Sequence, residues 1–370
     1  MTLGLTLVLE ALRGRELSST GTIPAATSAQ EVHAAVEVAT RNKVLLAVLG
    51  PMLPALSPSD LEFSHNYRLR TLANNAALLR EIVRVNRHLS DNKIDHIFIK
   101  GPIQSGVIYG DFLYRPASDI DVLVAARDYS HCVAVLAEID FRPASTSIWW
   151  RAFLGEQHLV KKGDRPVTVD LHYRLQQPGS PPPKDMGRYL ANPGYSTVLD
   201  VQVPRFADKD IPILSAISIV KALFNRETCG AHVCDLFALV KADTPEASSN
   251  FLVNADEQNL RGTALLALRI VSATFNVRYP MAEEIAAILP ELADERLVRM
   301  AFTPLDPDLV WPRRRDVLWA LCLQNRRAYA REILRSLASE TALRLFERRP
   351  SPTAVAGPDQ RRAGRSAPPS

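Results

Sequence analysis

The feature that most constrains the fold is a pair of aspartates at the start of an apolar strand. Asp119-Ile120-Asp121 runs directly into the apolar residues 122–124. Side chains two residues apart on a strand point to the same face, so both carboxylates are expected to enter one pocket while Ile120 faces the core. Two adjacent carboxylates repel each other unless a proton or a cation lies between them. The pattern therefore predicts a sheet with a charged site on one face.

Spacing alone is a weak signal, because two other segments share it. Asp208-Lys209-Asp210 and Asp306-Pro307-Asp308 have the same two-residue step. Neither lies in an apolar strand, and Pro307 disfavours one. We interpret both as solvated loop acids, so only the pair at Asp119 is predicted to form a site.

A third carboxylate, Asp170, lies in the apolar run 167–172. It shares a strand face with His172 and Arg174, and a salt bridge with Arg174 is the alternative role for it. If this strand lies beside the first, three carboxylates converge, as two-metal phosphoryl transfer requires. Mg²⁺ prefers oxygen ligands and commonly sits between carboxylates and substrate phosphates. We therefore predict Asp119, Asp121 and Asp170 as catalytic residues and Mg²⁺ ligands.

The turn Lys100-Gly101 supplies candidate phosphate-binding groups after the apolar run 94–99. A glycine at a strand-to-helix turn lets the backbone approach a phosphate, and the helix start offers free N–H groups. Lys100 or Arg115 could neutralise phosphate charge. For Arg115 the alternative is a salt bridge with Asp111 or Asp119.

Two motifs carry a family resemblance. They are Lys100-Gly101 followed by Tyr109 and Arg115-Pro116-Ala117-Ser118-Asp119-Ile120-Asp121-Val122-Leu123-Val124, and then Val169-Asp170-Leu171-His172-Tyr173-Arg174. Together they resemble an uncharacterised nucleotidyltransferase family of the DNA polymerase beta superfamily. The resemblance covers roughly residues 30–290 and is strongest over 94–174.

The resemblance implies that Asp119 and Asp121 are paired metal ligands, that Asp170 is the third acid, and that Gly101 lines the triphosphate. The residue patterns and the resemblance together give five predicted nucleotide-binding residues: Lys100, Gly101, Arg115, Ser118 and His172. The chain departs from the wider superfamily at two points: Gly101 lies 18 positions before Asp119, longer than the common spacing, and Pro102 replaces the usual serine after the glycine. No hydroxyl is available there to contact a phosphate.

Hydrophobic periodicity predicts an α+β fold, with α/β-like character: a small mixed β-sheet core, N-terminal helices and a C-terminal helical lobe. The resemblance implies that the core is a nucleotidyltransferase core. The predicted parts are an N-terminal helical segment (28–92), the core (93–214), the helical lobe (215–347) and a disordered tail (348–370). We also expect a frayed start over 1–27, a short strand at Ile211–Leu214 and a continuous helix over 315–345.

Composition narrows the class of protein. The net charge is +4, and the last 23 residues alone hold five Arg and one Asp, so the rest of the chain is near neutral. A nucleic-acid acceptor is possible but not indicated. Four cysteines without a CxxC pair disfavour a disulfide scaffold or zinc ribbon. No apolar run is long enough to span a bilayer and no secretory signal is evident, so we expect a cytoplasmic protein without membrane contact.

These observations predict an enzyme that moves a nucleoside monophosphate from an NTP, with ATP the first candidate, to an unknown acceptor with release of pyrophosphate. Mg²⁺ is the predicted cofactor. A catalytically inactive nucleotide-binding or regulatory protein of the same fold is the alternative. A transferase acting on RNA or on a protein is a second alternative. The sequence names neither the acceptor nor the oligomeric state.

Overall fold

The computed structural model describes residues 3–16, 27–145, 150–241 and 244–346. Within these ranges the chain combines one mixed sheet with many helices, so the predicted α+β class is confirmed. The predicted disordered tail (348–370) lies outside the described residues. The division of the chain at residues 92 and 214 stays a prediction.

The sheet has seven strands in the order β3-β4-β5-β2-β1-β7-β6. They are β1 (His96–Ile99), β2 (Ile120–Val124), β3 (Arg142–Pro143), β4 (Glu156–Lys161), β5 (Val167–His172), β6 (Gly194–Val198) and β7 (Val201–Arg205). Strand β2 runs parallel to β5 and antiparallel to β1, whereas β4 and β5 form an antiparallel hairpin. The strand that carries Asp170 therefore lies directly beside the strand that carries Asp121.

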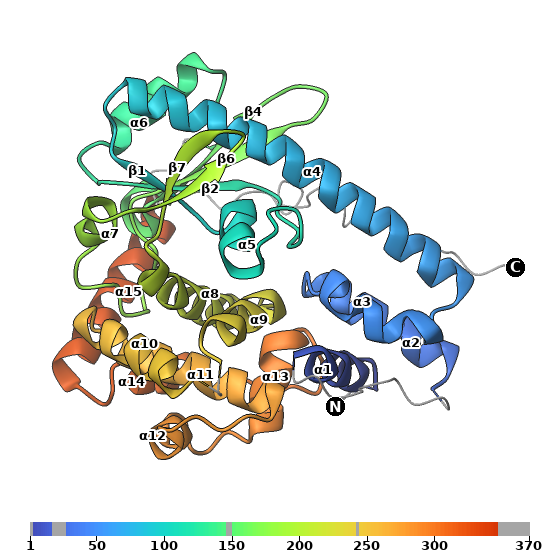
Figure 1. Cartoon of the computed structure of the whole chain (residues 1–370). Coiled ribbons are helices and arrows are strands. Elements are labelled where there is room, and N and C mark those ends of the chain that lie inside the picture. The colour runs from blue at the N-terminus through green and yellow to red at the C-terminus, as the bar shows by residue number, and fades with distance from the viewer. Residues whose placement is uncertain (1–2, 17–26, 146–149, 242–243, 347–370) are drawn as a thin grey trace, which may run out of the picture.

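Helices α4 (Pro58–Asp91) and α6 (Tyr129–Glu138) cover one face of the sheet, above it in Figure 1. Helix α4 begins at Ser57-Pro58, a pair typical of a helix start, and the Ser57 hydroxyl accepts the Asp60 N–H at 3.2 Å. Val122 and Val124 pack with these helices, whereas Leu123 belongs to a second apolar cluster on the other side. The alternation along β2 thus turns Asp121 toward the helices below the sheet.

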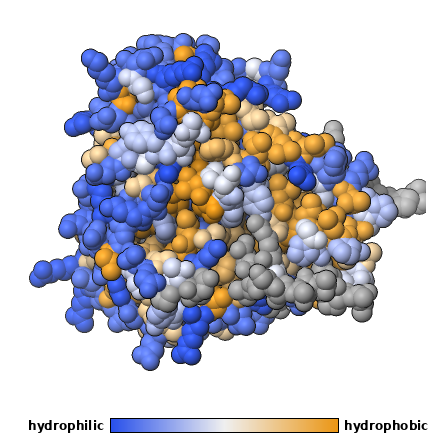
Figure 2. Space-filling view, viewed as in Figure 1, coloured by the Kyte–Doolittle hydropathy of each residue, from blue (hydrophilic) through white to orange (hydrophobic). Residues whose placement is uncertain are grey.

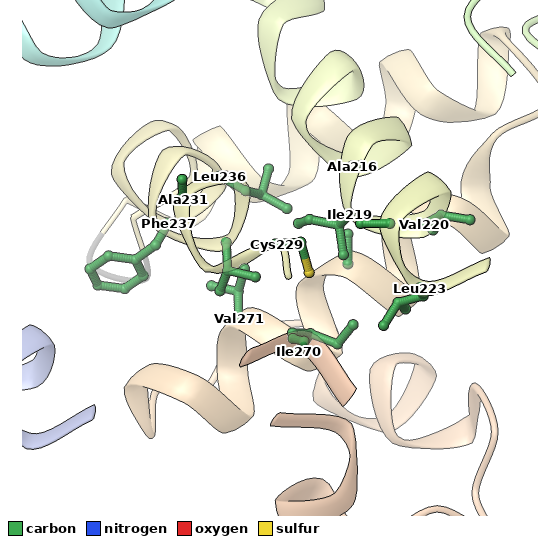
Figure 3. Close-up of a cluster of buried hydrophobic side chains, with 14 of the residues drawn as sticks. Ala216, Ile219, Val220, Leu223, Cys229, Ala231, Leu236, Phe237, Ile270 and Val271 are labelled. Atoms are coloured by element: carbon green, nitrogen blue, oxygen red, sulfur yellow. The ribbon is translucent and has the colours of Figure 1, made fainter. Parts of the chain in front are cut away.

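Those helices form a bundle at the bottom of Figure 1. They are α8 (Ile211–Asn225), α9 (Gly230–Leu239), α10 (Pro245–Glu257), α11 (Arg261–Phe275), α12 (Ala282–Ala287), α13 (Asp294–Phe302), α14 (Arg314–Leu321) and α15 (Arg326–Phe346). The short helix α7 (Gly187–Ala191) lies at the left of Figure 1, above α15. Figure 3 shows Ile219 and Leu223 of α8 among side chains of α9 and α11. Phe237 stacks on Phe275 with ring centroids 3.9 Å apart. This packing fixes the orientation of α8, which also carries Lys221.

The N-terminal helices pack on this bundle. They are α1 (Leu3–Glu16), α2 (Ala29–Arg41) and α3 (Leu45–Met52), and α5 (Gly101–Tyr109) follows β1. The predicted frayed start is wrong over α1, because Leu5, Val8 and Leu12 are buried in the same apolar cluster as α2 and α3. An apolar segment without a polar face shows little periodicity, and its partners are distant in the sequence.

Three further elements differ from expectation. Ile211–Leu214 is the first turn of α8 and not a strand, with Pro212 at a position that favours a helix start. The expected helix over 315–345 is broken between α14 and α15. Strand β6 was not predicted, because its burial does not follow a strong apolar pattern.

The surface is polar over most of the view in Figure 2, with hydrophobic residues gathered across its middle and right side. Helix α4 spans 34 residues, and its exposed apolar side chains include Leu61 and Leu69. Across the described ranges, no helix combines the length and the apolar character that a membrane span needs.

Candidate active site

The strand register brings the predicted acids to one face of the sheet. Asp121 on β2 pairs with Asp170 on β5, and the next same-face position pairs Leu123 with His172. Asp119 precedes Asp121 by two residues and so starts on the same face. The sequence predicted that the carboxylates would come together if their two strands were neighbours. The strands are neighbours, so Asp121 and Asp170 lie side by side.

Strand β4 adds two residues that sequence reasoning missed. In the β4–β5 hairpin, Glu156 pairs with His172 and His158 pairs with Asp170. The run Lys162-Gly163-Asp164 between the two strands predicts the turn of this hairpin from the sequence. Counting residue pairs outward from that turn could have placed Glu156 and His158 opposite the second motif. We call Asp119, Asp121, Glu156 and Asp170, with His158 and His172, the acid cluster.

Contacts within the acid cluster are close. His172 Nε2 lies 3.1 Å from Asp121 Oδ1, and His158 Nδ1 lies 2.6 Å from Asp170 Oδ1. Ligand atoms of Asp121, Asp170 and His172 lie within 4.8 Å of one another, close enough to share a metal ion. Asp119 is outside that group, and its Oδ2 accepts a hydrogen bond from Ser118 at 3.0 Å.

Two lysines face the acid cluster. Lys100 Nζ lies 3.6 Å from Asp121 Oδ1, and Lys221 Nζ from α8 donates to Glu156 Oε2 at 3.0 Å. Four carboxylates face these two ammonium groups, so the other two negative charges are balanced only by protons on His158 and His172, which a bound cation would replace. The acid cluster can therefore accept a divalent cation.

The pKa shifts reflect this imbalance. Burial raises the pKa of Asp119, and the negative charges of Asp121 and Asp170 raise it further. Burial alone would raise the pKa of Asp121, but Lys100 and His172 hold that pKa well below its usual range. Burial likewise opposes ionisation of Glu156, yet His172 and Lys221 lower its pKa to about 2. Among these three carboxyls only Asp119 has a raised pKa, because the charge of Lys43 offsets burial and the two neighbouring carboxylates only in part.

Lys100 and Gly101 form the turn from β1 into α5, as predicted. Both have positive φ angles, +62° for Lys100 and +56° for Gly101. Lys100 also has ψ of −157°, a region that residues other than glycine rarely occupy. This backbone conformation places the Lys100 ammonium beside Asp121 and the start of α5 beside the acid cluster.

Arg115 joins a different group of charges. Its guanidinium pairs with Asp235 of α9, and its Nη2 donates to His232 Nδ1 at 3.1 Å. The Tyr109 hydroxyl donates to the other Asp235 oxygen at 2.8 Å. Neither aspartate expected as an alternative partner of Arg115 makes this salt bridge. We call Arg115, Asp235, His232 and Tyr109 the Arg115 cluster.

Within the Arg115 cluster the charges balance. Asp235 is fully buried and Arg115 is 8% exposed, so the ion pair is shielded from water. Burial, followed by the nearby Arg115 and Lys100, lowers the pKa of His232 well below its usual range. A neutral His232 can accept the Arg115 hydrogen bond, as the contact requires.

A cavity of about 240 Å³ adjoins the Arg115 cluster directly and the acid cluster through Lys100 and Lys221, and five Lys or Arg side chains line it. Arg41 and Lys43 reach it from the end of α2, Lys100 and Arg115 from the core, and Lys221 from α8. Glu227 is the one acid among the described lining residues. The cavity can hold a polyanion, and Lys43 and Lys221 are contributions that sequence reasoning missed.

The other two aspartate pairs with the same spacing, at 208/210 and 306/308, were interpreted as solvated loop acids. That interpretation holds for only some of these four residues. Asp210 is 2% exposed and its Oδ1 accepts a hydrogen bond from Arg188 at 2.9 Å. Its burial depends on Arg188 and α10, which the local sequence does not reveal. Asp308 is exposed, as expected.

Comparison with known proteins now decides the family. Residues 28–276 match the family described as "Uncharacterised nucleotidyltransferase", and this match covers well over half of the chain. The chain belongs to this family. The predicted resemblance is thereby confirmed, and both sequence motifs lie inside the matched region.

Other comparisons add less. One solved structure, an antigenic nucleotidyltransferase-like protein from Paracoccidioides brasiliensis, is 12% identical, with a TM-score of 0.32. The similarity covers 56% of this nucleotidyltransferase-family chain and 95% of the other. At that level of similarity it supports no conclusion about the site. Among curated proteins no match was found.

Proposed function

We propose that this nucleotidyltransferase-family protein transfers a nucleoside monophosphate from an NTP to an acceptor hydroxyl or phosphate. The acceptor oxygen bonds to the α-phosphorus, the bond between that phosphorus and the α–β bridging oxygen breaks, and pyrophosphate leaves. The observation that carries the proposal is the register pairing of Asp121 with Asp170 beside a basic cavity. ATP is the first donor to test.

The residues present fit a divalent cation. The excess of carboxylates over ammonium groups and the raised pKa of Asp119 indicate a site that a cation would stabilise. In this proposal Asp119, Asp121 and Asp170 hold Mg²⁺. When bound, the ion would lower the pKa of the attacking group and neutralise the leaving pyrophosphate.

The protein's own groups would bind and orient the donor. Lys100, Gly101 and the start of α5 lie where a triphosphate could contact free N–H groups and an ammonium. Arg41 and Lys43 of the basic cavity would neutralise its distal charge, and Arg115, whose charge Asp235 already balances, would contribute as a hydrogen-bond donor that lines the cavity. Ser118 and His172 contact Asp119 and Asp121, and these contacts support roles in holding the two carboxylates next to the nucleotide.

One observation favours the inactive alternative. Lys100 and Lys221 already form ion pairs with Asp121 and Glu156, so a nucleotide-binding protein could keep this cluster without a metal. Such a protein would bind NTP equally well with and without Mg²⁺. The cytoplasmic location and the acceptor stay predictions.

The test is incubation of the purified protein with each α-labelled NTP, Mg²⁺ and cell extract. The proposal expects pyrophosphate release and a labelled acceptor. Asp170→Asn keeps the side-chain shape but removes one charge, so turnover should fall while NTP binding is partly retained. NTP binding without any transfer in any extract would support the inactive alternative. Normal turnover by the Asn variant would exclude the three-acid site.

A further inference from the structure

The β4–β5 hairpin places a second group of ligand atoms beside the first. Glu156, His158 and Asp170 each offer one atom, and these three atoms lie within 4.8 Å of one another. Asp170 belongs to both groups and so lies between them. Neither Glu156 nor His158 acts in the proposed transfer.

This second group is enclosed but reachable. Glu156 and Asp170 are each 9% exposed, whereas the His158 side chain is 37% exposed. Its two carboxylates are therefore largely withdrawn from water, and the imidazole lies on the solvent side. A metal site needs both features: ligands that are fixed in place and an entry path.

Lys221 orients Glu156 from outside the group. Lys221 Nζ donates to Oε2 at 3.0 Å, while Oε1 lies 3.8 Å from His158 Nε2. One carboxylate oxygen is thus fixed by the helix, and the other faces the imidazole. Partners that orient a ligand in this way are typical of metal sites.

The imidazole distinguishes this group from an all-oxygen site. The first group also has an imidazole, but His172 is 4% exposed and lies between Asp121 and Glu156, whereas His158 is 37% exposed. Mg²⁺ demands near-ideal octahedral oxygen coordination and keeps several waters. An imidazole with carboxylates suits first-row transition-metal dications instead. We propose that Glu156, His158 and Asp170 form a second cation site that binds such an ion, with Mn²⁺ as the probe, in preference to Mg²⁺. The site does not depend on the proposed nucleotidyl transfer.

The test uses the full chain with substoichiometric Mn²⁺, millimolar Mg²⁺ and no nucleotide. Pulsed electron paramagnetic resonance should detect ¹⁴N coupling from an imidazole ligand. His158→Gln should abolish that coupling and weaken Mn²⁺ binding at least about tenfold. His33→Gln is the matched control, because His33 Nδ1 makes a similar contact with Asp60 at 2.8 Å far from the acid cluster.

Two further variants separate this site from the Mg²⁺ site. Asp119→Asn and His172→Gln should leave the ¹⁴N coupling in place. Coupling that disappears in His172→Gln but persists in His158→Gln would assign the ion to the first group and overturn the proposal. A wild-type protein without ¹⁴N coupling would also overturn it, whatever the folding of the variants. None of these outcomes depends on transferase activity, so failure of the proposed function is detected separately.

Discussion

The acid cluster and the Arg115 cluster adjoin one basic cavity, yet their charges are arranged differently. In the Arg115 cluster, the buried Asp235 carboxylate has its own guanidinium and a tyrosine hydroxyl. In the acid cluster, four carboxylates face two ammonium groups. The buried ion pair of Arg115 and Asp235 joins the sheet core to the helices. The acid cluster has more carboxylates than ammonium groups, and such an excess indicates a site for a cation.

The largest expected effect is on activity. Asp121→Asn should lower transfer by at least about a hundredfold, because it removes charge placed to act in the transition state. The fold should persist, as circular dichroism would show. Asp308→Asn is the control, since Asp308 has the same aspartate spacing but is exposed. Equal losses in both variants would remove the distinction between a site acid and a surface acid.

A substitution in the Arg115 cluster should lower the free energy of unfolding of the protein. Asp235→Ala leaves Arg115 buried without its partner and should cost about 3–5 kcal/mol in the free energy of unfolding. Urea denaturation measures this cost. Asp208→Ala removes an exposed ion pair with Arg205 and should cost no more than about 1 kcal/mol. Similar costs for the two variants would show that the Arg115 cluster does not join the core to the helices.

A pH series sharpens the comparison within the acid cluster. The pKa of Glu156 is lowered from 4.5 to about 2, so ionised Glu156 stabilises the fold above pH 4.5. That contribution is lost as the pH falls from 4.5 toward 2. Unfolding free energies of the wild type and Glu156→Gln should therefore converge over this range. A constant difference for Glu156→Gln would contradict the assigned ion pairs.

The smallest effect is expected from charge outside both clusters. Deleting residues 348–370 removes a net charge of +4 but no part of either cluster. Melting temperature and transfer rate should stay unchanged, because the segment has too little apolar content to pack. A clear fall in either value would show that the tail contributes to the folded body.

Local pattern was sufficient where a residue's role depends on its own strand. Asp121 and Asp170 were predicted because each lies in an apolar run whose alternation fixes its face. Glu156 and His158 were missed because their position depends on cross-strand register with β5. The same reason explains Arg115, whose partner Asp235 is 120 residues away in the chain.

The errors in the fold prediction lie in short apolar segments of the sequence. Ile211–Leu214 fits a buried strand and a buried helix equally well, and only its continuation into α8 decides between them. The first 16 residues could not be assigned because the helices that bury α1 come later in the sequence. Such elements depend on tertiary packing, so no local pattern identifies them.

The most direct test of the carboxylate excess in the acid cluster is the melting temperature of Asp119→Asn, measured first in EDTA and then in Mg²⁺. Because burial and then the neighbouring carboxylates raise the pKa of Asp119, its charge costs stability when no cation is bound. The variant should therefore melt above the wild type in EDTA, and Mg²⁺ should raise the melting temperature of the wild type by more than that of the variant. A variant that melts below the wild type in EDTA, with equal shifts for both proteins in Mg²⁺, would contradict the cation site.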